Sequence, residues 1–217
     1  MAIPRIPAYR IPELPETSTT HWHPNPQRAA LLVHDMQEYF LAAYDHAAEP
    51  VSRVVENISA LIRAAEQHKI PVYFSVQPPQ QKRDRRGLLS EFWGPGLQTE
   101  ADARVVDKLP LDTNNPLHHV VTKWRYSAFE RTDLRHALAY AGRDQLLITG
   151  VYGHIGCKVT ATDAFMSDIQ PFLINDAIAD FSAADHAQTT DWVARRCGMV
   201  SNTHEILSQL EAVVVSR

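Results

Sequence analysis

Short apolar runs alternate with helical segments through most of this chain, and this alternation restricts its fold more than any other feature. Residues 29–34 (Ala-Ala-Leu-Leu-Val-His) form a run that ends before Asp35, a pattern typical of a strand buried on both faces. Residues 51–68 follow with apolar side chains at helical spacing. The same reasoning predicts further strands at 70–76, 118–122, 145–151, 171–175 and 198–201, and further helices at 133–141, 156–168, 183–196 and 203–210. Strands that alternate with helices predict right-handed crossovers and an open parallel sheet, here of six strands.

The composition excludes several classes of protein. A length of 217 residues suits one domain that can bury its own hydrophobic core. The 21 Lys and Arg against 25 Asp and Glu give a net charge of -4, so no basic surface for nucleic acid or anionic lipid is expected. No run approaches the roughly 20 apolar residues that cross a bilayer. Cys157 and Cys197 are too few for a secreted disulfide scaffold. These features predict a cytoplasmic protein that contacts neither nucleic acid nor membrane.

The first 28 residues differ from the rest of the chain. They hold six of the fourteen prolines and show neither helical nor strand periodicity. We expect an extended arm over residues 1–28, followed by a single domain over residues 29–217. The arm carries apolar side chains that need cover, either on a neighbouring copy or on the same chain: Ile3, Ile6, Tyr9, Ile11 and Leu14.

Two residues with chemical potential stand directly after predicted strands. Asp35 follows the first strand and Lys123 follows the third. Ligands of open parallel sheets bind beyond the carboxyl ends of the strands, so the acid and the lysine are predicted to converge on one crevice. Either residue alone is more often a surface charge or a helix cap. No G-x-G-x-x-G, G-x-x-x-x-G-K-[ST], G-x-S-x-G, C-x-x-C or H-E-x-x-H motif occurs, which leaves nucleotide-phosphate binding and a serine nucleophile without support.

At these residues the chain resembles the isochorismatase-like hydrolases, and within them the isochorismatases of catechol-siderophore synthesis. The matching stretches extend from about residue 1 to residue 210 and include 32–40 (LVHDMQEYF), 88–96 (LLSEFWGPG), 122–129 (TKWRYSAF), 142–146 (GRDQL), 150–157 (GVYGHIGC), 163–172 (DAFMSDIQPF) and 176–182 (DAIADFS). The resemblance implies a three-layer α/β/α fold around a parallel six-stranded Rossmann-like sheet. It also implies no metal and no organic cofactor, and a non-proline cis peptide between Val151 and Tyr152. Together with the prevalence of two-fold assemblies, it implies a homodimer.

One departure from the wider superfamily bears on the chemistry. Its amidohydrolase branch, the nicotinamidases, uses an Asp-Lys-Cys triad whose cysteine stands six residues after the glycine that ends the fourth strand. Here that position is Gly156, and the cysteine follows one place later at Cys157. A shift of one residue at the start of a helix rotates a side chain by about 100°. Cys157 is therefore predicted to point away from Asp35 and Lys123 and to be structural.

The implied substrate, isochorismate, is an enol ether whose hydrolysis requires a proton on the terminal methylene carbon and no protein nucleophile. Water then captures the oxocarbenium ion, and the hemiketal collapses to pyruvate and 2,3-dihydroxy-2,3-dihydrobenzoate. Asp35 is the candidate general acid and must carry a proton when it acts. Lys123 opposes that protonation unless it turns toward the substrate.

The other contacts of the substrate are predicted from the same strand ends. Aromatic walls are expected from Phe40, Trp93 and Tyr126. The pyruvyl carboxylate is expected on Gln77 and Arg86, although Arg83 and Arg85 lie in the same basic run. Tyr152 and the backbone N–H of Gly156 are expected at the enolpyruvyl end.

Three other functions stay open at this stage. The nearest is the phenazine-pathway hydrolase of 2-amino-2-deoxyisochorismate, a substrate that differs by an amine for a hydroxyl at one ring carbon. A nicotinamidase-like amidase conflicts with Gly156. A non-catalytic docking module has no need of Asp35 and Lys123. Siderophore isochorismatases often carry an aryl-carrier domain, so a carrier protein or synthetase is a candidate partner.

Overall fold

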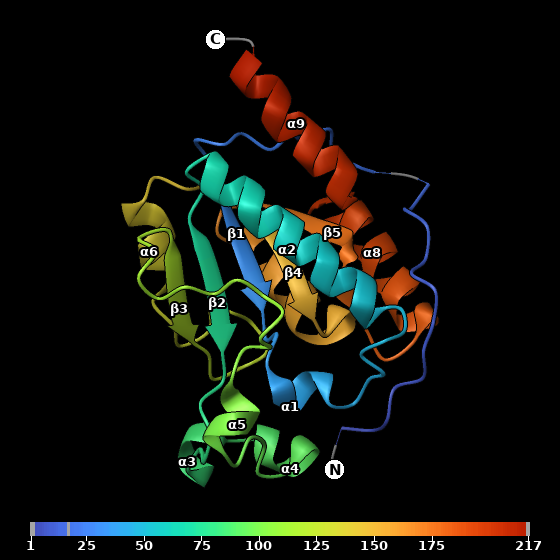
Figure 1. The fold of residues 1–217 in the computed structure, drawn as a ribbon, viewed down its shortest axis with the longest axis vertical. Helices are drawn as coiled ribbons and strands as arrows, with labels where there is room; N and C mark the ends of the chain where they lie inside the picture. The colour runs from blue at the N-terminus through green and yellow to red at the C-terminus, as the bar shows by residue number, and fades with distance from the viewer. Residues whose placement is uncertain (1–2, 17, 216–217) are drawn as a thin grey trace.

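A six-stranded, fully parallel sheet forms the centre of the molecule (Figure 1). The computed structural model describes residues 3–16 and 18–215. The strands lie in the order β3-β2-β1-β4-β5-β6. Their bounds are β1 Ala29–His34, β2 Val72–Val76, β3 His118–Thr122, β4 Gln145–Val151, β5 Gln170–Ala179 and β6 Met199–Ser201. The chain moves outward from β1 to β3 and then returns to β4 on the other side of β1, so the strand order reverses between β1 and β4. Ligands bind at such a reversal in doubly wound sheets.

Helices cover both faces of the sheet, which confirms the predicted three-layer α/β/α fold. The α2 helix (Val51–Gln67) and the α9 helix (Thr203–Val215) pack on one face. The opposite face is covered by α6 (Leu134–Tyr140), α7 (Lys158–Phe165) and α8 (Ala183–Arg196). Four short helices lie beyond the carboxyl ends of the strands (Figure 1), namely α1 Glu38–Leu41, α3 Arg83–Arg86, α4 Leu89–Trp93 and α5 Glu100–Ala103. A π-helical turn, η1 (Gly153–Cys157), connects β4 to α7.

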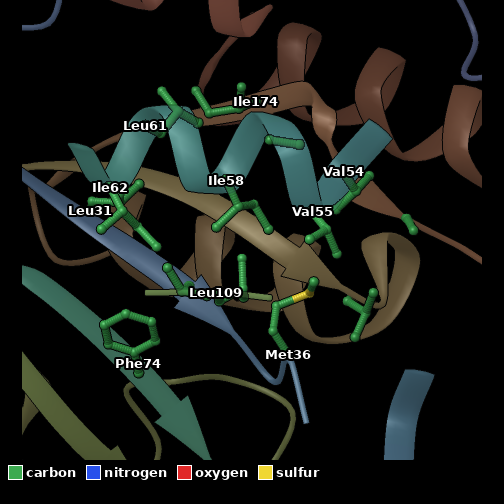
Figure 2. Packing of buried hydrophobic residues seen from close by; sticks show 14 of the residues in the cluster. Leu31, Met36, Val54, Val55, Ile58, Leu61, Ile62, Phe74, Leu109 and Ile174 are labelled. Carbon is green, nitrogen blue, oxygen red and sulfur yellow. The ribbon is translucent and has the colours of Figure 1, made fainter. Parts of the chain in front are cut away.

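The continuous apolar run of β1 follows from this arrangement. Leu31 and Val33 pack in the core beneath α2, whereas Ala30 and Leu32 pack in the core beneath α6 to α8. Successive strand residues point to opposite faces, so a strand covered on both sides must be apolar at every position. Figure 2 shows the first of these cores, with Ile58 of α2 directed toward the sheet. Full burial of one such side chain stabilises the fold by about 1.5–3 kcal/mol.

The amino-terminal segment packs on its own domain. Within residues 3–16 and 18–28 the chain forms no helix or strand. The side chain of Ile6 is only 3% exposed and belongs to the core under α2. The Ile6 amide donates to the carbonyl oxygen of Ala43 at 2.8 Å, and the Tyr9 amide donates to the carbonyl oxygen of Glu49 at 3.2 Å. The same chain therefore covers the apolar side chain of Ile6.

The fifth strand is longer than the apolar pattern predicts. The predicted strand ends at residue 175, whereas β5 continues to Ala179. Polar side chains interrupt the apolar run at Asn175 and Asp176, but both have partners. Asn175 Nδ2 donates to the carbonyl oxygen of Pro12, and Asp176 Oδ1 accepts from the amide of Thr203. Within the described residues, no helix combines the length and hydropathy that a membrane span requires.

Candidate active site

A pocket lies beyond the carboxyl ends of β1, β2, β3 and β4 and has about 500 Å³ of space free of atoms, its open side included. All nine residues proposed from the sequence are part of its lining: Asp35, Phe40, Gln77, Arg86, Trp93, Lys123, Tyr126, Tyr152 and Gly156. They come from strand ends, from α1, α3, α4 and η1, and from the loop after β3. The fold thus brings together residues that are up to about 120 positions apart, as expected for a site at the strand-order reversal.

Asp35 follows β1 directly and is nearly inaccessible, at 4% exposure. Its backbone has a φ of 50°, in the left-handed region that aspartate tolerates better than most residues. Its carboxylate accepts two hydrogen bonds and forms one ion pair. Lys123 Nζ lies 2.9 Å from Oδ2, Gln77 Nε2 donates to Oδ2 at 3.3 Å, and Ser75 Oγ donates to Oδ1 at 3.1 Å. The carboxyl group therefore lies among three groups that can each donate to it.

Three oxygen atoms surround the ammonium group of Lys123. Besides Asp35, its Nζ donates to the carbonyl oxygen of Arg125 at 2.6 Å and to that of Tyr126 at 3.1 Å. The residue is 1% exposed. Two hydrogen bonds and one ion pair within the protein therefore enclose its ammonium group. The lysine is therefore directed at Asp35 rather than toward the substrate, in contrast to the orientation that would ease protonation of Asp35.

Arg86 brings an unpaired positive charge to the pocket. It is 4% exposed, its Nε donates to the carbonyl oxygen of Gly94 at 2.6 Å, and its Nη1 has no hydrogen-bond partner among the described residues. No carboxylate of the described part of the chain forms a salt bridge with it. Burial lowers the pKa of Arg86 from its usual value. A buried guanidinium with a free N–H suits an anionic ligand, which would supply the missing acceptor.

Aromatic side chains enclose the rest of the pocket. Trp93 Nε1 donates to the hydroxyl oxygen of Tyr126 at 2.7 Å, which ties α4 to the loop after β3. Tyr152 and Phe40 meet edge to face, with ring centroids 6.0 Å apart. The Tyr152 hydroxyl donates to the carbonyl oxygen of Phe40 at 2.7 Å, and burial raises the pKa of Tyr152. Its proton is thus committed to the backbone, and its ring is the surface that it offers to a ligand.

The chain turns sharply between β4 and η1. The peptide bond between Val151 and Tyr152 is cis, as the family resemblance implies. Gly156, in the last turn of η1, lines the pocket beside Asp35. Gly150, at the end of β4, has a φ of 105° and packs so closely on the backbone of His34 that a β-carbon there would lie 2.7 Å from the His34 nitrogen. Only glycine fits that position.

Cys157 lies outside the pocket. Its side chain is 0% exposed, belongs to the core beneath α6 to α8, and lies 4.0 Å from the carbonyl oxygen of Thr149. Burial raises the pKa of the Cys157 thiol well above its usual value. The one-residue shift relative to Gly156 therefore directs the sulfur into the core, as predicted. A neutral, enclosed thiol is a poor nucleophile.

We expect Cys157→Ala to keep most of the activity of the parent protein, because the thiol contacts neither the pocket nor the charged side chains that line it. Initial rates and mass spectrometry of the parent protein during turnover test this together. Cys197→Ala, at the second buried cysteine, is the matched control. A covalent adduct on Cys157 that accumulates during turnover would contradict the structural role.

Sequence reasoning missed six lining residues: Ile3, His34, Tyr39, Leu89, Val151 and Ile155. Four of them stand within or directly beside matched motifs and adjoin proposed residues in the chain, which is the signal that could have found them. Leu89 lies inside the 88–96 stretch but four residues from Trp93. Ile3 has no such signal, because it comes from a segment without periodicity and reaches the pocket only through tertiary packing.

Comparisons with known proteins identify the family of this chain. Residues 29–205 match the isochorismatase domain family. The chain is 47% identical over 211 residues to enterobactin synthase component B of Escherichia coli K12, covering 95% of this chain and 73% of the relative. It is 44% identical over 215 residues to the isochorismatase of Bacillus subtilis, covering 97% and 68%. It is 43% identical over 209 residues to phenazine biosynthesis protein PhzD of Pseudomonas fluorescens, covering 94% and 98%.

A solved structure shows the same fold at lower sequence similarity. A cysteine hydrolase from Pseudomonas syringae superimposes with a TM-score of 0.80 at 22% identity, covering 92% of this chain and 99% of the other. The family match extends over most of the chain and includes every proposed site residue. The chain therefore belongs to the isochorismatase family of hydrolases.

Proposed function

We propose that this protein hydrolyses the enol-ether bond of isochorismate, giving pyruvate and 2,3-dihydroxy-2,3-dihydrobenzoate, in the synthesis of a catechol siderophore. One observation carries the proposal: a carboxylic acid, Asp35, and a buried guanidinium without a counter-ion, Arg86, line the same aromatic pocket. The substrate has the matching parts, an enol ether to protonate and carboxylates to bind. The names of the relatives from Escherichia coli and Bacillus subtilis support the same reaction.

Binding places the vinyl group over the acid. The guanidinium group of Arg86 and the side-chain amide of Gln77 receive the pyruvyl carboxylate, and the rings of Trp93 and Phe40 enclose the dihydroaromatic ring. Asp35 must carry a proton before it can act as the general acid. The negative charge of the bound substrate favours the protonated form of Asp35, because a nearby like charge makes the ionised form of a carboxyl group less favourable.

The bond changes then balance without a protein nucleophile. Asp35 gives its proton to the terminal methylene carbon, which becomes a methyl group and leaves an oxocarbenium ion. Water adds to that ion and returns a proton to Asp35. The hemiketal collapses, the ring oxygen leaves with a proton, and pyruvate is released. Lys123 acts on Asp35 and not on the substrate: its ammonium holds the carboxylate in place between turnovers.

Hydrolysis of 2-amino-2-deoxyisochorismate is the second candidate, because PhzD matches over 98% of its length. That substrate carries an ammonium group in place of the hydroxyl group, and an ammonium group binds best beside a free carboxylate. Asp35 is the one acidic side chain in the pocket lining described here, and Lys123 already neutralises it. The pocket therefore favours isochorismate.

Three parallel assays separate these functions. Pyruvate release from isochorismate and from its 2-amino analogue, and ammonia release from nicotinamide, are measured with the same preparation. We expect the highest kcat/KM with isochorismate. A higher kcat/KM with the amino analogue would replace the proposal by the second candidate, and ammonia release alone would replace it by an amidase.

Arg86→Met is expected to raise KM for isochorismate by about 10- to 100-fold, the loss expected for a hydrogen bond between charged groups. The unfolding free energy should not fall, because methionine fills similar space and removes a buried charge that has no counter-ion. Steady-state kinetics and urea unfolding measure the two effects. Arg83→Met, on the exposed side of α3, is the matched control and should change neither. An unchanged KM for Arg86→Met would remove this residue from substrate binding.

The assembly and location of the protein form part of the same proposal. We infer a homodimer in the cytoplasm that delivers its product to a carrier protein or synthetase. Two free, buried cysteines support a reducing compartment, and a relative that is a component of a synthase supports such a partner. The exposed Val120 on the edge strand β3 and the exposed Tyr140 on α6 offer apolar surface for a second copy. Light scattering at micromolar concentration should give twice 24.5 kDa; a mass of one chain at every concentration would contradict the dimer.

A further inference from the structure

His34 is a buried imidazole beside Asp35 that the mechanism above does not use. It is the last residue of β1 and is 1% exposed. Its Nδ1 lies 2.8 Å from the carbonyl oxygen of Val151, at the end of β4. Its Nε2 lies 3.2 Å from the carbonyl oxygen of Tyr126, in the loop after β3. The ring therefore connects the ends of three strands that contribute residues to the pocket.

The contact with Tyr126 links His34 to Lys123. The Tyr126 carbonyl oxygen accepts from Lys123 Nζ at 3.1 Å as well as facing His34 Nε2, and a carbonyl oxygen has two lone pairs for two such contacts. Lys123 Nζ in turn lies 2.9 Å from Asp35 Oδ2. A displaced Tyr126 carbonyl would therefore displace the ammonium that holds the carboxylate. His34 is thus connected to Asp35 through these two groups, and its Nδ1 also lies 3.8 Å from Asp35 Oδ2.

The same imidazole fills the space into which a side chain at position 156 would project. A β-carbon on Gly156 would overlap Cε1 of His34 and would lie 2.7 Å from Nε2 and 3.0 Å from Nδ1. The φ of Gly156 lies outside the left-handed region, so its backbone conformation does not itself require glycine. Burial lowers the pKa of His34, and a neutral imidazole has one N–H, so the ring donates to one of the two carbonyl oxygens and cannot turn away without losing that hydrogen bond. The ring of His34, and not the backbone conformation, therefore leaves no room for a side chain at position 156.

We propose that His34 determines the type of catalysis in this pocket: its imidazole excludes every side chain, and hence every nucleophile, from position 156, and it positions Lys123 through the Tyr126 carbonyl. Position 156 lines the pocket, and a β-carbon there would lie 3.0 Å from His34 Nδ1, an atom that is itself 3.8 Å from Asp35 Oδ2. A thiol or hydroxyl group at position 156 would therefore lie where a covalent reaction could start. The exclusion of side chains follows from packing alone, whereas the positioning of Lys123 rests on the proposed function.

A double-mutant cycle tests the exclusion without any substrate. Gly156→Ala should lower Tm by roughly 2–12 °C, the range expected for an overpacked site in a protein of this size. In a His34→Ala background the same substitution should cost little, because the alanine methyl group enters the space left by the ring. Gly153→Ala is the matched control in the same turn: its β-carbon would meet Asp180 Oδ2 at 2.6 Å and not His34, so its Tm loss should be equal in both backgrounds. An equal loss from Gly156→Ala in both backgrounds would overturn the exclusion.

Kinetics test the positioning role. His34→Ala should lower kcat by about 10- to 100-fold, the effect of a displacement near 1 Å at reacting groups. KM should change little, because no hydrogen bond joins His34 to Arg86 or Gln77. His34→Gln should recover part of the lost kcat, since its amide nitrogen stands as many bonds from Cα as Nε2 and can donate to the Tyr126 carbonyl. A raised KM with unchanged kcat, or no recovery by His34→Gln, would overturn the positioning role. A parent protein that releases no pyruvate would instead contradict the proposed function, and the Tm cycle would still decide the exclusion.

Discussion

Asp35→Asn is expected to bind substrate and to lose at least about 10²-fold in kcat, the lower end of the contribution of a general acid. The amide keeps the shape of the carboxyl group and one oxygen acceptor for Lys123, but it has no acidic proton for the methylene carbon. KM should stay close to that of the parent protein, because Arg86 and Gln77 hold the pyruvyl carboxylate. Stopped-flow binding and steady-state pyruvate release measure the two quantities separately.

The control for this variant is Asp107→Asn, at an exposed aspartate remote from the pocket, which should leave kcat unchanged. Turnover of Asp35→Asn near the parent rate would remove Asp35 from the proton transfer. A different acid would then have to be sought, and no other acidic side chain occurs in the pocket lining described here.

Lys123→Met is expected to lower both stability and turnover. The substitution leaves the Asp35 carboxylate, at 4% exposure, without its cation, and loss of one partner of a buried ion pair typically costs about 3–5 kcal/mol of unfolding free energy. Turnover should fall as well, because the carboxylate loses the group that holds it. Urea unfolding and steady-state kinetics check these effects.

A second substitution separates the ion pair from simple packing. In Lys123→Met/Asp35→Asn no charge remains unpaired, so the double variant should be more stable than Lys123→Met alone. Lys108→Met, at an exposed lysine, should change the unfolding free energy by no more than about 0.5 kcal/mol. A Lys123→Met protein as stable as the parent would show that the pair contributes little to the fold.

The strands of the sheet could be predicted from the sequence because each one is recognised by the pattern of its own few residues. A parallel strand covered on both faces must be apolar at every position, and the run at 29–34 coincides with β1. Asp35 and Lys123 were predictable for a related reason, since a strand ends where the first polar residue enters the crevice. The extension of β5 was not predictable, because Asn175 Nδ2 and Asp176 Oδ1 find their partners far away in the chain.

The details of the site depend on backbone groups that a sequence pattern does not place. The orientation of Lys123 is set by the carbonyl oxygens of residues 125 and 126, whose positions depend on the whole loop. The choice among three neighbouring arginines is settled by burial: Arg86 is enclosed, whereas Arg85 lies over the ring of Trp124, 5.6 Å from its centroid. Such features arise only after the chain has folded.

The place of Ile3 in the pocket wall has a practical consequence for assays. A histidine tag or fusion protein joined on the amino-terminal side of Ile3 would lie only a few residues from the pocket lining, to which Tyr39 also belongs. The other end of the chain is a safer attachment point, because α9 runs toward the end of the molecule that lies opposite α1 (Figure 1). Kinetic constants for this enzyme should therefore be measured on protein purified by a carboxyl-terminal tag or after complete removal of an amino-terminal one.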